Sequence, residues 1–87
     1  MANRPLMPLP SDELTPEELR QRIEEWAASQ GYQSTFRPAS REYGAIAVTD
    51  PAGGHTYTTI HNAHRGRRLR KDQVRWAVRN LNSNWRG

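Results

Sequence analysis

The sequence predicts an α+β domain of two layers, with its elements in the order α-β-β-β-α and a three-stranded antiparallel sheet that carries both helices on one face. Three observations lead to this prediction. Apolar residues recur at helical spacing near the start and near the end of the chain. Three short segments between them are rich in β-branched and aromatic residues. A Pro-Ala-Gly-Gly turn separates the last two of these segments. A sheet covered on one side by helices buries both patterns in one core.

The first helix is predicted over residues 16–30. Thr15 has the character of an N-cap, Pro16 suits the first helical position, and Glu18 completes a capping box. Gly31 can take the left-handed conformation that ends a helix. The apolar face of this helix consists of Leu19, Ile23, Trp26 and Ala27. The residues before it, 1–14, contain three prolines and no periodic pattern, so we expect a flexible N-terminal tail followed by one small domain over 15–87.

Three strands are predicted next, over 32–37, 43–49 and 55–61. The last two form a hairpin, because the segment 50–54 combines proline with two glycines. The second helix is predicted from about residue 69 or 70 to about residue 82. Since helices cover only one face of the sheet, we expect the other face to meet solvent and to carry the many threonines. The apolar face of the second helix consists of Val74, Ala77, Val78, Leu81 and Trp85.

Charge is distributed unevenly along the chain, which has a net charge of +4. Residues 65–87 hold eight Arg or Lys and one acid, against five Arg and eight acids in residues 1–64. Such asymmetry favours an anionic partner. The absence of cysteine excludes disulfides and thiolate metal sites, and we expect neither a metal nor a cofactor. With no signal peptide and no membrane-spanning segment in the sequence, we expect a cytoplasmic protein without a membrane partner.

The candidate nucleic-acid-binding residues lie in a dense basic stretch. One interpretation is a solvated basic loop, and the other is a phosphate-binding surface that continues along one side of the second helix. Lys71, Arg75 and Arg79 are spaced so as to form one row of cations on that helix. Trp76 falls nearly opposite the apolar face. It either packs under the N-terminal segment or the first helix, or it offers a surface for a base or a protein partner. The full candidate set is Arg65, Arg67, Arg68, Arg70, Lys71, Arg75, Arg79 and Trp76.

Two histidines, His61 and His64, are the candidate catalytic residues. They are spaced i, i+3 where the third strand meets the basic loop. A histidine there could act as general base on a ribose 2′-OH. The alternative is two partly exposed polar residues that end a strand. A metal site is not expected from this pair, since further ligands would have to come from distant carboxylates.

The order of elements resembles the double-stranded-RNA-binding-like fold. The segment 49–78 is similar to the C-terminal half of HicA-type toxins, which are small mRNA interferases. That resemblance covers about residues 15–82. It is carried by a Pro-x-Gly turn, a His-x-Gly loop, a Lys-containing start to the second helix and a Gly-aromatic end to the first, which are here Pro51-Ala52-Gly53, His64-Arg65-Gly66, Arg70-Lys71 and Gly31-Tyr32.

One position departs from the HicA pattern. The resemblance places the family's catalytic histidine directly after Gly44, where this chain has Ala45. An alanine cannot transfer protons, so we expect nucleic-acid binding, RNA before DNA, without cleavage. Two alternatives stay open. One is a HicA-like ribonuclease that uses His61 or His64. The other is a phage or plasmid protein that binds and inhibits a host protein, with that host protein or an antitoxin as the partner of the second helix.

Overall fold

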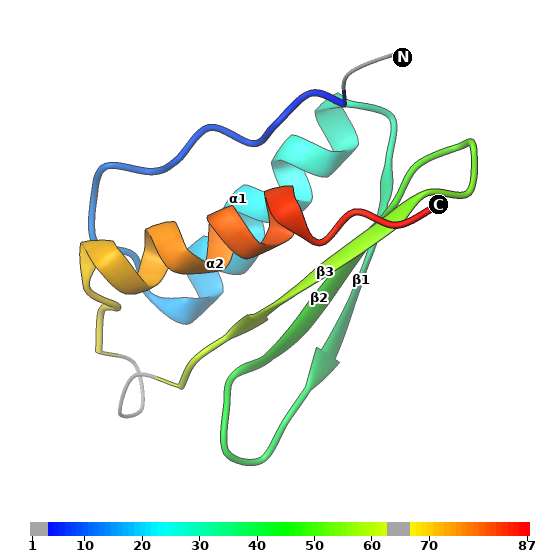
Figure 1. Cartoon of the computed structure of the whole chain (residues 1–87). Coiled ribbons are helices and arrows are strands. Elements are labelled where there is room, and N and C mark those ends of the chain that lie inside the picture. Colours follow the sequence, from blue (N-terminus) through cyan, green and yellow to red (C-terminus); the bar gives the residue numbers. More distant parts are fainter. Residues whose placement is uncertain (1–3, 63–66) are drawn as a thin grey trace.

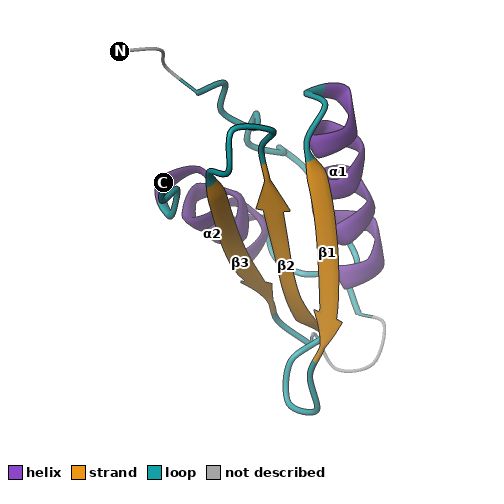
Figure 2. Ribbon diagram, turned by 90° about the vertical axis from the view of Figure 1, so that its right-hand side faces the viewer, coloured by secondary structure: helices purple, strands orange, loops and turns teal. Residues whose placement is uncertain are grey.

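A computed structural model describes residues 4–62 and 67–87 of the chain. Its sheet has the strand order β1-β2-β3, and both pairings are antiparallel. Figures 1 and 2 show both helices on the same side of this sheet, as the sequence predicted. Each element agrees with its predicted range to within two residues. The elements are α1 (Pro16–Ser29), β1 (Gln33–Pro38), β2 (Gly44–Thr49), β3 (His55–Ile60) and α2 (Lys71–Ser83).

The start of α1 is held by the predicted capping box. The Thr15 hydroxyl accepts a hydrogen bond from the Glu18 backbone N–H at 3.1 Å, and the Glu18 carboxylate accepts one from the Thr15 N–H at 2.9 Å. These bonds satisfy two backbone groups that a helix start otherwise leaves without partners. Gly31 has a φ of 74°, which is the left-handed conformation expected after the helix end. Local sequence signals therefore fix both ends of α1.

The start of α2 is set by a tertiary contact. Leu69 is buried, and its backbone N–H donates to the carbonyl oxygen of Leu14 at 2.7 Å in a short antiparallel bridge. This bridge keeps Leu69 extended, so the helix begins at Lys71, one or two residues later than predicted. Four of the five residues predicted for the apolar face of α2 are buried, namely Val74, Ala77, Val78 and Leu81.

The sheet turns one face to the helices and leaves the other open. Register pairs Ile46 with Thr58 and Val48 with Thr56, and all four side chains are buried. The expectation that the threonines lie on the open face is therefore wrong for Thr56 and Thr58. The Thr56 hydroxyl donates to the backbone carbonyl of Leu81 in α2 at 2.6 Å, which offsets the cost of its burial.

The N-terminal segment makes specific contacts, although the sequence suggested a flexible tail over residues 1–14. Met7 is buried, and its backbone N–H and carbonyl both pair with the Asn82 side chain, at 2.9 and 3.0 Å. Arg4 forms an ion pair with Asp50 at 3.2 Å and lies over the Trp85 ring. Figure 1 shows this segment, in blue, running past both helices. Its contacts are distant in sequence, so no local pattern predicts them.

Two of the three tryptophans lie at the edge of the core. Trp26 is partly buried and packs edge-on against Tyr32, which in turn packs edge-on against Trp85. Trp26 and Trp85 therefore border the core, whereas the sequence predicts both on the apolar faces of the helices. No helix among the described residues has the length and apolar character needed to cross a membrane.

Candidate nucleic-acid interface

The basic stretch divides into two regions in the structure. Residues 67–70 directly precede α2, and Arg68 among them contacts the start of α1, whereas the later basic residues belong to α2 itself. His64 and Arg65 lie outside the described residues. The remaining candidates, Arg67 to Arg79, are all on the described part of the chain, and their surroundings differ.

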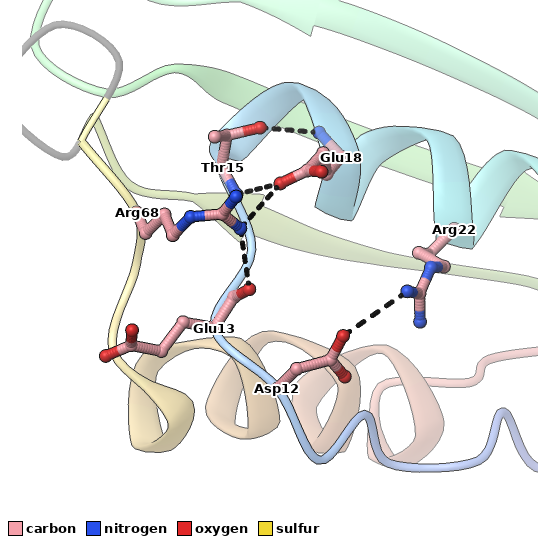
Figure 3. A network of polar contacts seen from close by, with 6 residues as sticks. All are labelled: Asp12, Glu13, Thr15, Glu18, Arg22 and Arg68. Atoms are coloured by element: carbon pink, nitrogen blue, oxygen red, sulfur yellow. Dashed lines mark hydrogen bonds and ion pairs between the residues drawn. The ribbon is translucent and has the colours of Figure 1, made fainter.

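Arg68 is engaged in a network at the start of α1 (Figure 3). Its guanidinium donates to the carboxylate of Glu18 at 3.3 Å and to the backbone carbonyl of Glu13 at 3.2 Å. The backbone hydrogen bond from Thr15 lowers the pKa of the Glu18 carboxyl, and the nearby charges of Arg68 and Arg22 lower it further. Arg68 thus ties the loop before α2 to the capping box of α1.

The cations of α2 have a different environment. Arg70 forms an ion pair with Asp72 at 3.4 Å, and both side chains are largely exposed. In residues 4–62 and 67–87, no ion pair involves Arg67, Lys71, Arg75 or Arg79, and all four are exposed. Lys71, Arg75 and Arg79 form the row that their spacing predicted, since residues four apart are neighbours on a helix. This row leaves its positive charges available to an external anion.

Trp76 lies in a groove between α2 and the end of β3. The groove has a volume of about 400 Å³ and is lined by His61, Asp72, Gln73, Trp76 and Arg79. The indole is 45% exposed, and its ring centre lies 5.3 Å from that of the His61 imidazole, with the planes tilted by 36°. Of the two interpretations of Trp76, the structure favours the exposed surface. The imidazole covers part of the indole and leaves the rest open.

His61 connects this groove to the loop before β2. Its Nδ1 lies 3.9 Å from a carboxylate oxygen of Glu42, which is an ion-pair distance and too long for a hydrogen bond. Ala45, where the resemblance places a catalytic histidine, points to the open face of the sheet, because Gly44 and Ile46 on either side are buried toward the helices. Ala45 does not line the groove that contains His61.

Sequence reasoning missed Asp72 and Gln73, which line the groove, and Glu42, which lies beside His61. Asp72 and Gln73 had a detectable signal, since they lie four and three residues before Trp76 and therefore share its side of the helix. Glu42 had none, because its proximity to His61 depends on the pairing register of β2 with β3. No three side chains of the His, Asp and Glu types come together as a metal site in the described residues.

Comparisons with protein-family models, curated proteins and solved structures found no match to this chain. The resemblance to HicA-type toxins therefore stays an expectation from the sequence. Any functional conclusion must come from the site itself.

Proposed function

We propose that this protein binds single-stranded RNA through the groove around Trp76 and the cations of α2. The observation that supports the proposal is the exposed indole of Trp76, which lies on a helix whose outward side carries Lys71, Arg75 and Arg79 without ion-pair partners among the described residues. An aromatic ring beside several free cations is the combination by which proteins hold single strands. The ring stacks on a base and the cations contact phosphates.

The energetics of such a site divide between the two kinds of contact. Stacking of a base on an aromatic side chain contributes about 1–3 kcal/mol. Each phosphate contact releases counterions, so affinity falls as salt rises. Duplex RNA offers phosphates but not unstacked bases, so an exposed indole favours a single strand. RNA is proposed over DNA because the sequence resembles an RNA-acting family.

The test is fluorescence anisotropy with a labelled short single-stranded RNA of mixed sequence, and with the DNA of the same sequence. Trp76→Ala is expected to weaken RNA binding by about tenfold, as loss of one stacking contact implies. Tyr57→Ala is the matched control, because Tyr57 is also an exposed aromatic, at 54%, but lies on the open sheet face. Equal effects of the two substitutions, or no RNA binding by the wild type, would contradict the proposal. Association with cell extract that survives nuclease treatment would point to a protein partner.

A second candidate function is RNA cleavage, and the proximity of His61 to Glu42 favours it. A ribonuclease needs a group that accepts the proton of the 2′-OH and a group that returns a proton to the leaving oxygen. His61 and Glu42, 3.9 Å apart beside the groove, are two titratable groups of the kind required. The decisive assay incubates end-labelled RNA with the wild type, His61→Ala and Glu42→Gln. Cleavage by the wild type that both variants lose would establish this function. If the wild type leaves the RNA intact, cleavage is ruled out and only the binding function remains.

A further inference from the structure

One feature of the groove does not suit a site that only holds phosphate. Asp72 places a carboxylate on the lining, in a stretch of chain that is otherwise basic. A carboxylate repels phosphate, so a groove built for phosphate alone would be better without it. One of its oxygens lies 3.4 Å from the Arg70 guanidinium, which leaves the other oxygen without a partner among the described residues. A carboxylate of this kind is suited to hydrogen-bond donors of a ligand.

We propose that the groove selects guanine, with the base stacked on Trp76, its donor edge on Asp72 and its acceptor edge on Arg79. This inference rests on the proposed RNA-binding function and specifies which nucleotide the groove takes. It concerns a guanine presented by a single strand, whose flanking phosphates reach the cations of α2.

The placement of the three side chains supports this arrangement. Asp72 precedes Trp76 by four residues and Arg79 follows it by three, so both are direct neighbours of the indole on the helix surface. Their α-carbons are separated by about 10.5 Å along the helix axis, from a rise of about 1.5 Å per residue. A base stacked on the indole thus lies between a group that only accepts hydrogen bonds and a group that only donates them.

The hydrogen-bond donors and acceptors on each base determine which of the four bases fits between a carboxylate and an arginine. Guanine carries two adjacent donors, N1–H and the N2 amino group, which match the two oxygens of a carboxylate. It also carries the acceptors O6 and N7, to which arginine binds with two hydrogen bonds. Adenine and cytosine each present a single amino group beside acceptors, and uracil presents one N–H between two carbonyls. Only guanine combines a paired donor edge with a paired acceptor edge.

Gln73 adds a further donor to the groove. Its side-chain oxygen accepts a hydrogen bond from the backbone N–H of Arg70 at 3.0 Å, which fixes the orientation of the amide. The amide nitrogen is a donor and makes no hydrogen bond within the described residues. The groove therefore offers donors from Gln73 and Arg79 in addition to the acceptor from Asp72.

The first measurement compares four labelled oligouridines that differ in one central nucleotide. The strand with a central guanosine is expected to bind about tenfold more tightly than those with adenosine, cytidine or uridine, the discrimination expected from one bidentate base contact. Equal binding of all four would overturn the guanine inference and leave the proposed function standing. Binding of none would overturn both.

The second measurement assigns the two edges. Inosine lacks the N2 amino group that would meet Asp72, and 7-deazaguanosine lacks the N7 acceptor that would meet Arg79. The wild type is expected to bind the strand with either analogue several-fold more weakly than the strand with guanosine. With Asp72→Ala the inosine penalty should vanish and the 7-deaza penalty should remain, whereas Arg79→Ser should show the reverse. Penalties that are unchanged in these variants would overturn the assignment.

For each variant, the affinity for the guanosine strand is divided by the affinity for the strand with the analogue. This ratio is compared because removal of the Asp72 charge is expected to raise the affinity for every RNA. Asp12→Ala is the matched control, since Asp12 is also an exposed aspartate paired with an arginine, Arg22 at 3.5 Å, but lies outside the groove. This control variant should leave the ratio of guanosine affinity to analogue affinity unchanged. Guanosine monophosphate is tested as a competitor. If it competes as well as the guanosine strand, the groove is a site for a free nucleotide and the RNA-based inference fails.

Discussion

Two arginines in the same basic stretch, Arg68 and Arg79, serve different purposes in the structure. Arg68 donates to Glu18 and to the Glu13 carbonyl and so joins the start of α2 to the start of α1. Arg79 lines the groove beside Trp76 and has no ion-pair partner among the described residues. Both are exposed, and both belong to the candidate set that the sequence defined. The difference arises from what lies opposite each of them.

The difference shows that a run of positive charge is not a unit of function. The capping box of α1 lies close to Arg68, and the Glu18 carboxylate in that box forms an ion pair with the Arg68 guanidinium. In the described residues, the only ion pair on the outward side of α2 is that of Arg70 with Asp72, close by in sequence. Substitutions in the two regions should therefore separate stability from binding, and each of the following predictions tests that separation.

The largest expected effect is on stability, at the boundary between the regions. Leu69 follows Arg68 directly and is almost completely buried, and its N–H bonds to Leu14. Leu69→Ala leaves a cavity and should lower the free energy of unfolding by about 2–5 kcal/mol. Chemical denaturation followed by far-UV circular dichroism measures this. Trp76→Ala on the outward side is the comparison and should change the stability much less. A loss as large for Trp76 as for Leu69 would show that the outward side belongs to the core.

A smaller loss is expected from the cap of α1. Thr15→Ala removes the hydroxyl that accepts from the Glu18 N–H, and caps of this kind contribute about 0.5–2 kcal/mol. Thr15→Ser keeps the acceptor and should recover most of the stability. RNA affinity should be the same in both variants at a temperature where they are folded. A parallel loss of RNA binding would mean that the α1 region takes part in recognition.

Removing charges from one region at a time tests whether the segment around Arg68 serves stability while the outward side of α2 serves RNA binding. Lys71→Ser with Arg75→Ser removes two cations that have no ion-pair partner among the described residues, so the slope of log affinity against log salt should fall by about 1.4, from about 0.7 per phosphate contact on a single strand. Arg68→Ser removes a paired cation and should leave that slope unchanged while lowering the melting temperature. A variant of the open sheet face, Arg37→Ser, controls for net charge. A change of slope in Arg68→Ser as large as that of the double variant would contradict the distinction.

Most of the fold was predictable from the sequence because it is encoded locally. The capping box at Thr15, the left-handed Gly31 and the apolar spacing of α2 each depend on residues a few positions apart. The features that were missed depend on distant contacts. The sequence predicts that Thr58 faces solvent, but the pairing of its strand turns its side chain into the core. It predicts that Met7 belongs to a flexible tail, but the Met7 backbone is hydrogen-bonded to Asn82. Local patterns contain no information on such partners.

The candidate site was predictable in its residue types and less so in its grouping. The sequence identified His61, Trp76 and Arg79, and the structure brings these three to one groove. It could not indicate that Arg68 is paired, since its partner Glu18 lies 50 positions earlier in the chain. It also gave no reason to separate His61 from Ala45. That separation follows from the alternation of side chains across the sheet, which places Ala45 on the open face.

The smallest expected effect is the dependence of stability on acid, and it should be concentrated in the paired region. The pKa of Glu18 is lowered in the folded protein, first by the hydrogen bond from the Thr15 backbone and then by the charges of Arg68 and Arg22. A carboxyl whose pKa is lower in the folded than in the unfolded state stabilises the fold above its unfolded pKa. That contribution is lost as the pH falls through the lowered value.

Glu18→Gln tests this, because glutamine keeps the acceptor of the capping box and removes the charge. The wild type should melt at the higher temperature near neutral pH, and the gap between the two proteins should close as the pH falls below the ordinary glutamate range. Asp50 should behave in the same way at the other end of the molecule. Burial raises its pKa, but hydrogen bonds from Gly54, Arg4 and Ala52 lower it by more. RNA affinity at neutral pH should be equal in wild type and Glu18→Gln, since the charge removed belongs to the paired region. A gap that stays constant down to strongly acidic pH would show that the Glu18 carboxylate does not stabilise the fold through its charge, and would reduce the structural role of Arg68 to hydrogen bonds such as that to the Glu13 carbonyl.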